Sequence, residues 1–187
     1  MNNKYFIIGG ARSGKSYWGQ LLSENLPGQK IFLATAQAWD DEMRERIRRH
    51  QEVRGASWQT VEEPLQISEK LTELDHPGNV ILLDCLTLWL SNLMTVAELP
   101  EKEIEEQCRS LARLLPNLQS TIILVSNEVG WGIVPDNYLS RLFRDLAGQL
   151  NRWTAASCST VIMVTAGLPL ALKGILPELM QSALKES

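Results

Sequence analysis

Residues 5–16 read Tyr-Phe-Ile-Ile-Gly-Gly-Ala-Arg-Ser-Gly-Lys-Ser. An apolar run is followed at once by the pattern G-x-x-x-x-G-K-S, and a helix-forming run continues over residues 17–24. A loop placed between a strand and a helix turns its backbone N–H groups toward an anion, and the helix adds its positive end. The stretch therefore predicts a phosphate-binding loop for a nucleoside triphosphate.

Each position of this loop has an expected role. Gly9 and Gly14 are expected to allow positive φ and a close backbone approach to the anion. The ammonium of Lys15 can reach the β- and γ-phosphates, and the Ser16 hydroxyl can bind Mg²⁺. The alternative, a glycine turn with a chance lysine, is disfavoured by the strand and helix patterns on either side. The expected nucleotide contacts are Gly9, Gly10, Ala11, Arg12, Ser13, Gly14, Lys15 and Ser16.

The rest of the chain alternates short apolar runs with helical patterns. The runs lack polar alternation, which is typical of parallel strands covered on both faces. Apolar stripes predict helices over residues 101–115 and 138–156. We therefore predict an α/β fold, namely a single-domain P-loop NTPase fold over residues 1–187, with a mostly parallel open sheet and helices on both faces. The expected strands are residues 5–8, 30–34, 80–84, 121–126 and 160–165, with a short edge strand at 58–61, and residues 175–187 are expected to form a tail helix.

Composition narrows the class of protein. The net charge of −4 argues against a nucleic-acid partner, because no basic excess is present to bind phosphates. The most apolar stretch, residues 80–94, contains Asp84 and is too short to span a membrane. Three scattered cysteines indicate neither a zinc site nor a disulfide framework, and they suit a reducing compartment. We expect a cytoplasmic protein whose cysteines are small buried apolar residues.

Asp84 ends the apolar run of residues 80–84. A carboxylate at the tip of a buried strand is the second part of a phosphate-loop site, where it holds Mg²⁺ directly or through water. The alternative is that Asp84 caps the helix that follows.

Residues 40–54 form an unusual charged segment with acids at its start and bases near its end. Met43, Ile47 and His50 share a helical face, which places the imidazole between the protein body and water. A neutral imidazole is nucleophilic and can attack phosphorus, and nearby arginines can bind phosphates. The alternative is a solvated helix with a histidine near its end.

Residues 127–135 read Asn-Glu-Val-Gly-Trp-Gly-Ile-Val-Pro and follow a predicted strand. Their apolar side chains suggest a surface for a large, partly apolar substrate, or a loop that packs on a neighbouring segment. Arg141 and Arg144 begin the next helix, where they either bind phosphate or face solvent.

Taken together, these segments resemble the bifunctional adenosylcobinamide kinase/adenosylcobinamide-phosphate guanylyltransferase family of cobalamin biosynthesis. The resemblance runs from about residue 5 to residue 173. The segments that carry it are residues 9–16, Ala34-Thr-Ala36, Asp40-Asp-Glu-Met43 with Arg46-Ile47 and His50, residues 127–135 and residues 143–151. The family is similar to recombinase-type P-loop proteins in fold.

The resemblance implies two reactions. ATP or GTP phosphorylates the aminopropanol hydroxyl of adenosylcobinamide, and GTP then gives GMP to adenosylcobinamide phosphate, with release of pyrophosphate. In the family a histidine carries the GMP covalently, and the matching position is His50. Lys15 is the other expected catalytic residue, and Ser16 and Asp84 are the expected Mg²⁺ ligands.

The resemblance also implies further contacts and a homo-oligomer, with a trimer as the family's tendency. Some relatives have a second histidine where this chain has Arg49, and others have Glu at position 84. The implied nucleotide contacts beyond the loop are Ala34, Thr35, Ala36, Gln51, Glu52, Val53, Arg54, Glu62 and Asp84.

Two other functions stay open at this point. One is a small-molecule kinase with the same loop and no guanylyl transfer. The other is a nucleotide-dependent switch or ATPase module that acts on a macromolecule.

Overall fold

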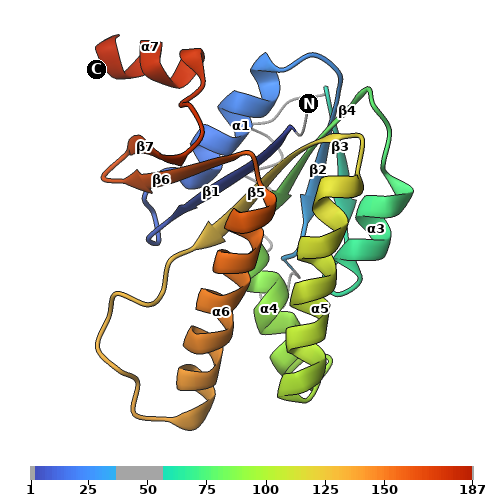
Figure 1. Ribbon diagram of the computed structural model, residues 1–187, viewed down its shortest axis with the longest axis vertical. Helices are drawn as coiled ribbons and strands as arrows, with labels where there is room; N and C mark the ends of the chain where they lie inside the picture. Colours follow the sequence, from blue (N-terminus) through green and yellow to red (C-terminus); the bar gives the residue numbers. More distant parts are fainter. Residues whose placement is uncertain (1–2, 37–56, 187) are drawn as a thin grey trace.

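The computed structural model describes residues 3–36 and 57–186 (Figure 1). The strands are β1 (Lys4–Gly9), β2 (Gln29–Ala34), β3 (Trp58–Glu62), β4 (Asn79–Asp84), β5 (Thr121–Asn127), β6 (Thr160–Thr165) and β7 (Leu168–Lys173). The helices are α1 (Lys15–Asn25), α3 (Ile67–Glu73), α4 (Leu86–Thr95), α5 (Glu101–Leu114), α6 (Tyr138–Ser157) and α7 (Glu178–Glu186), with a 3-10 turn at Leu115–Asn117. None of the helices in these ranges is long and apolar enough to span a membrane.

The described strands form one sheet in the order β3-β2-β4-β5-β1-β6-β7. Neighbouring strands are parallel except for β7, which pairs antiparallel with β6. The predicted α/β fold with a mostly parallel sheet is confirmed, and the expected edge strand is β3. Strand β7, which extends the other edge, was not predicted from the sequence.

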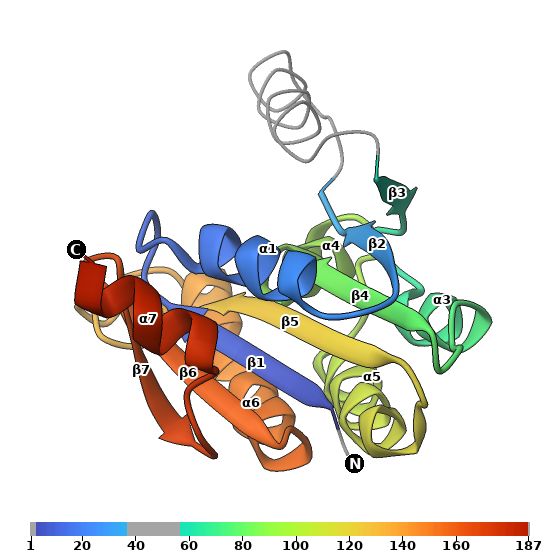
Figure 2. The ribbon, with the colours of Figure 1, turned by 90° about the horizontal axis from the view of Figure 1, so that it is seen from above.

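Both faces of the sheet are apolar because both are covered. Alternate residues of one strand belong to two separate cores: Ile81 and Leu83 of β4 face one, and Val80 and Leu82 face the other. Helices α1 and α7 cover the second face, and α5 and α6 lie on the opposite side (Figure 2). This double coverage explains why the strands show no polar alternation.

The two predicted amphipathic helices are α5 and α6. Ile104, Cys108 and Leu111 of α5 are fully buried against the sheet, as their spacing predicts. In α6 the apolar residue Leu139 is exposed. It lies in the first turn of the helix, before the segment that contributes Leu146 and Leu150 to the core.

The three cysteines are buried, as expected for small apolar residues. Burial raises the pKa of Cys85, Cys108 and Cys158 to about 12. These thiols are therefore protonated at neutral pH and are poor nucleophiles.

At the C-terminal end, Met180 of α7 is fully buried in the core that also contains Trp18 and Leu22 of α1. Helix α7 is thus held to the body of the protein by a buried side chain.

Candidate active site

Residues expected to bind nucleotide lie along the carboxyl edge of the sheet. Ala34 at the end of β2 pairs with Glu62 of β3 on one side and with Asp84 of β4 on the other. Gly9, at the end of β1, is the first residue of the phosphate loop. In open α/β sheets, ligands bind beyond this edge. The register therefore brings four separate segments of the sequence to one side of the molecule.

The phosphate loop has its expected conformation at Gly14. Gly14 precedes α1 with a φ of 101°, a left-handed conformation that glycine adopts without a steric penalty. Gly9 is different, because its φ is not positive. A Cβ at Gly9 would lie 2.1 Å from the carbonyl oxygen of Val164 in β6. The expectation of positive φ was wrong for Gly9, where glycine is needed for close packing of two strands.

Lys15 lies inside the loop. Its ammonium donates a hydrogen bond to the carbonyl of Gly10 at 2.5 Å, and the side chain is buried. Burial lowers the pKa of the Lys15 ammonium, and the negative charge of Asp84 opposes that shift. The loop therefore holds a largely desolvated cation close to the carboxylate that ends β4.

The turn between β6 and β7 supports the loop from the side. Gly167 donates its N–H to the carbonyl of Ser13 at 3.0 Å and accepts a hydrogen bond from the Trp18 indole at 2.8 Å. Ala166 and Gly167 both have positive φ, as a two-residue hairpin turn requires. This support from the turn at Gly167 was not predicted from the sequence. The signal was present in a glycine between two short apolar runs.

The loop also contains a polar atom with no protein partner. The Ser13 hydroxyl is buried and has no hydrogen bond among the described residues. Buried polar groups are usually paired, so an orphan of this kind in a phosphate loop fits a site that a ligand completes.

Asp84 and Ser16 offer oxygen atoms of the kind that Mg²⁺ prefers. Cys85, and not Asp84, occupies the N-cap position of helix α4. The alternative role of Asp84 as a helix cap is therefore wrong. Ser16 directly follows Lys15, and within the described residues its hydroxyl forms no hydrogen bond that would compete with a metal.

Thr35 ties the carboxyl ends of two strands together. Its hydroxyl donates to the Cys85 carbonyl at 2.8 Å and accepts from the Cys85 N–H at 2.9 Å. Asn92 of α4 donates to the Thr35 carbonyl at 2.8 Å. The Thr35 side chain is fully buried, so the role that its hydrogen bonds support is to position the residues around Asp84. Nucleotide contacts by Thr35, Ala36 and Glu62 stay predictions.

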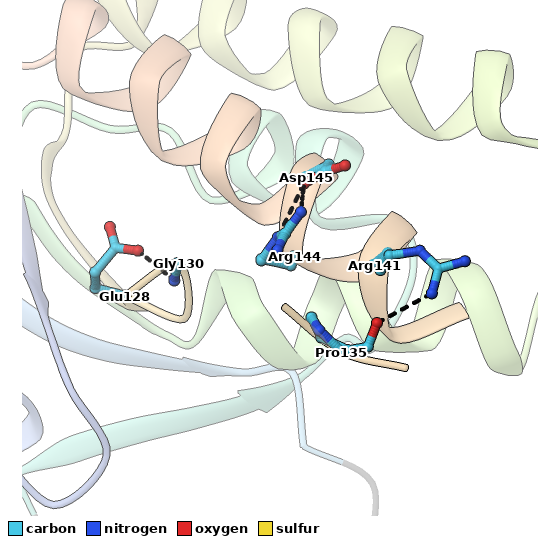
Figure 3. Close-up of polar contacts among 6 residues, drawn as sticks. All are labelled: Glu128, Gly130, Pro135, Arg141, Arg144 and Asp145. Atoms are coloured by element: carbon cyan, nitrogen blue, oxygen red, sulfur yellow. Dashed lines mark hydrogen bonds and ion pairs between the residues drawn. The ribbon is translucent and has the colours of Figure 1, made fainter. Parts of the chain in front are cut away.

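Residues 128–137 form an exposed apolar loop between β5 and α6. Trp131 and Ile133 are 79% and 97% exposed, so the alternative of a loop packed on its neighbours does not hold for these side chains. Glu128 accepts a hydrogen bond from the Gly130 N–H at 2.7 Å and shapes the first turn of the loop (Figure 3).

The two arginines at the start of α6 have local partners. Arg141 donates to the carbonyl of Pro135 at 3.0 Å and so holds the end of the loop, and Arg144 pairs with Asp145 (Figure 3). A pocket of about 310 Å³ lies beside this region. Its lining residues are Gly130, Arg144, Asp145, Gly148, Gln149 and Arg152.

The candidate nucleophile and its neighbours lie outside the described residues. They are His50, Gln51, Glu52, Val53 and Arg54. Their roles stay predictions.

A glycine-rich loop between the first strand and the first helix of a parallel sheet, facing an aspartate at the tip of another strand, defines a P-loop nucleotide-binding protein. Solved structures support this fold. A prototypical ATPase from the type III secretion system of pathogenic bacteria superposes with a TM-score of 0.57 at 11% identity, over 99% of this chain and 62% of that chain. The ATPase EscN from enteropathogenic E. coli also has a TM-score of 0.57 at 11% identity, over 98% of this chain and 52% of that one.

Sequence relatives give the family. The model of the cobinamide kinase / cobinamide phosphate guanyltransferase family matches residues 5–172. The bifunctional adenosylcobalamin biosynthesis protein CobP of Pseudomonas aeruginosa is 44% identical over 168 residues, which cover 90% of this chain and 96% of the relative. CobU proteins of Salmonella typhimurium and Escherichia coli are each 35% identical over 178 residues, covering 89% of this chain and 98% of each relative. The chain belongs to this family of enzymes.

Proposed function

We propose that the chain catalyses both reactions of its family. It phosphorylates adenosylcobinamide with ATP or GTP, and it then transfers GMP from GTP to adenosylcobinamide phosphate, in cobalamin biosynthesis. The observation that carries this proposal is the family match over residues 5–172, in a chain whose phosphate loop has the expected positive φ at Gly14 and holds the Lys15 ammonium at the Gly10 carbonyl.

In the kinase step, the oxygen of the substrate hydroxyl attacks the γ-phosphorus and its proton is released to water, while the bond to the bridging oxygen breaks and the nucleoside diphosphate leaves. Phosphoryl transfer depends mainly on positioning and on stabilisation of charge. The backbone N–H groups around Gly14 hold the phosphates, and Lys15 exchanges its bond to Gly10 for phosphate oxygens. Ser16 and Asp84 would hold Mg²⁺, which neutralises phosphate charge when bound.

In the guanylyl step, a ring nitrogen of His50 attacks the α-phosphorus of GTP, and pyrophosphate leaves. A phosphate oxygen of adenosylcobinamide phosphate then attacks the same phosphorus, the P–N bond breaks, and His50 is regenerated. The covalent intermediate divides one displacement into two in-line steps. One nucleotide site can serve both reactions if they alternate.

The exposed loop at residues 128–137 is our candidate surface for the corrin ring. Apolar side chains as exposed as those of Trp131 and Ile133 usually mark a binding surface when they gather in one segment. The loop follows β5, so it begins at the same edge of the sheet as the phosphate loop.

We further infer a cytoplasmic homo-oligomer, with a trimer as the expected form.

The guanylyl step is tested with GTP labelled at the α-phosphorus. The wild-type protein should retain label after denaturation without acid, and His50→Ala should retain none while it still phosphorylates adenosylcobinamide. The chain has two histidines, so His76→Ala is the matched control. His76 accepts a hydrogen bond from Gly78 in a turn before β4, at the opposite edge of the sheet, and this variant should label normally. Label on His50→Ala would refute the assignment, and a wild-type protein that phosphorylates without labelling would be a kinase alone.

A second variant tests the phosphate loop. Lys15→Ala removes the cation that compensates phosphate charge, so triphosphate binding should weaken on the order of 100-fold and both reactions should be suppressed. Calorimetric titration with GTP, together with product masses from a cobinamide assay, measures both effects. Full kinase activity in Lys15→Ala would contradict the role of the loop.

A further inference from the structure

We propose that Asn127 is a further catalytic residue, whose side-chain amide donates a hydrogen bond to the terminal phosphate of the bound triphosphate. The inference rests on the nucleotide site of the proposed function and adds a residue to it. Four observations carry it: strand order, strand face, the tethering of the Asn127 backbone, and an amide without a partner in the described part of the chain.

Strand order places Asn127 between the two halves of the site. β5 lies between β4, which ends at Asp84, and β1, which leads into the phosphate loop. Asn127 pairs with Gly9, and Val125, two residues earlier, pairs with Asp84. The end of β5 is therefore flanked by the loop on one side and by the candidate metal ligand on the other.

The side chain of Asn127 is on the face of the sheet where the triphosphate would lie. Ile123 and Val125 of β5 belong to the core beneath α1, and residues two apart on a strand share a face. Asn127 continues that row beyond the core. Leu82 of β4 is in the same core, so Asp84 is on this face as well. Helix α1, which begins with Lys15, covers this side.

The backbone of Asn127 is fixed by side chains from two helices. Its N–H donates to the Thr87 hydroxyl of α4 at 2.7 Å, and its carbonyl accepts from the Asn151 amide of α6 at 3.1 Å. The next residue, Glu128, donates its N–H to the Gly9 carbonyl at 2.9 Å. These bonds hold the end of β5 in one position relative to the loop. Because the backbone is already fixed, ligand binding has to order only the side chain of Asn127.

The hydrogen bonds of Asn127 to described residues are made by its backbone, and its side-chain amide has none among them. A carboxamide suits a place beside a phosphate because it donates hydrogen bonds and carries no negative charge. It can also stand next to Asp84 without forming an ion pair that would compete with the substrate. A fixed donor aimed at the transferred phosphoryl group stabilises the charge that spreads over its oxygens.

The test compares triphosphate and diphosphate binding, because only the triphosphate has the group that Asn127 contacts. In titrations of the full-length protein, Asn127→Ala should bind GTP roughly 10- to 100-fold more weakly than wild type and should bind GDP with nearly unchanged affinity. The kinase kcat should fall at least as much. Asn127→Asp keeps the side-chain shape but adds a negative charge, so its loss of GTP affinity should be larger.

Asn117→Ala is the matched control. It removes the same amide from an exposed asparagine that precedes β5, at the opposite edge of the sheet, and whose side chain bonds only to the Arg113 carbonyl within the described ranges. It should match wild type in both titrations. Equal losses of GTP and GDP affinity in the Asn127 variants would show a role in shaping the loop and would overturn the proposal, as would unchanged GTP binding. The titrations need no corrinoid, so failure of wild type to phosphorylate cobinamide would count against the proposed function alone.

Discussion

Gly14 and Gly9 mark the two ends of the phosphate loop, and each excludes a side chain for its own reason. Gly14 needs its positive φ to begin α1. Gly9 needs the absence of a Cβ, because β1 and β6 pair closely where the loop leaves the sheet. The loop therefore depends on β6 and on the turn that follows it, although these lie about 150 residues further along the chain.

Gly9→Ala tests this dependence. The added Cβ would lie 2.1 Å from the Val164 carbonyl oxygen, so β1 and β6 must separate. Overpacking of this kind costs about 1–3 kcal/mol. Urea unfolding should show a loss of that size. The control is Gly10→Ala, whose Cβ would meet nothing within 4 Å and whose unfolding free energy should change by less than about 0.5 kcal/mol. Equal losses in the two variants would contradict the packing argument.

Among the elements, β2, β4 and α4 are joined by a buried polar connection. Thr35 binds both backbone groups of Cys85, and Asn92 binds the backbone carbonyls of Thr35 and Pro64. These bonds fix the position of the carboxyl end of β4 in the sheet. They therefore also fix where Asp84 lies relative to the phosphate loop. We therefore expect Thr35 to affect catalysis through the position of Asp84.

Thr35→Val removes the hydroxyl and keeps the shape. The Cys85 N–H would be left buried without its partner, which costs about 1–3 kcal/mol. We expect a matching fall in the free energy of unfolding and a lower kinase kcat, because Asp84 loses its fixed position. Thr95→Val is the control, since that exposed hydroxyl donates to the Ser91 carbonyl one turn earlier in α4. Normal stability in Thr35→Val would contradict the assigned role.

The parallel strands were predictable to within one or two residues because burial on both faces leaves continuous apolar runs. β7 was not, because Leu168, Leu170 and Leu172 are exposed and the strand is defined only by its pairing with β6. The phosphate loop was predictable because its chemistry is local in sequence. The roles of Thr35 and Gly167 were not, because they depend on hydrogen bonds between distant segments whose register no local pattern specifies.

At the scale of the whole molecule, the β7 edge of the sheet is unusually apolar. Leu168, Leu170 and Leu172 are 54%, 59% and 59% exposed, and Ile175 just beyond them is 81% exposed. Leu168 and Leu170 share one face because they alternate along the strand, and Leu172 lies at the irregularity in the pairing that follows. Leu170 pairs with Met163, so this face continues the core that lies beneath α6 (Figure 2). Contiguous exposed apolar surface of this kind marks association sites, and an open strand edge offers backbone groups for pairing.

We therefore expect the inferred homo-oligomer to bury this edge. Burying a leucine side chain is worth about 1.5–3 kcal/mol, so a charge at the centre of the row should prevent assembly. In light scattering, the wild-type protein should have a mass that is a multiple of 21.0 kDa, and Leu170→Arg should have the mass of one chain. Val96→Arg, at a partly exposed apolar position after α4, is the control and should assemble normally. An unchanged mass for Leu170→Arg would assign the oligomer contact to another surface, and a single-chain mass for wild type would remove the expectation of an oligomer.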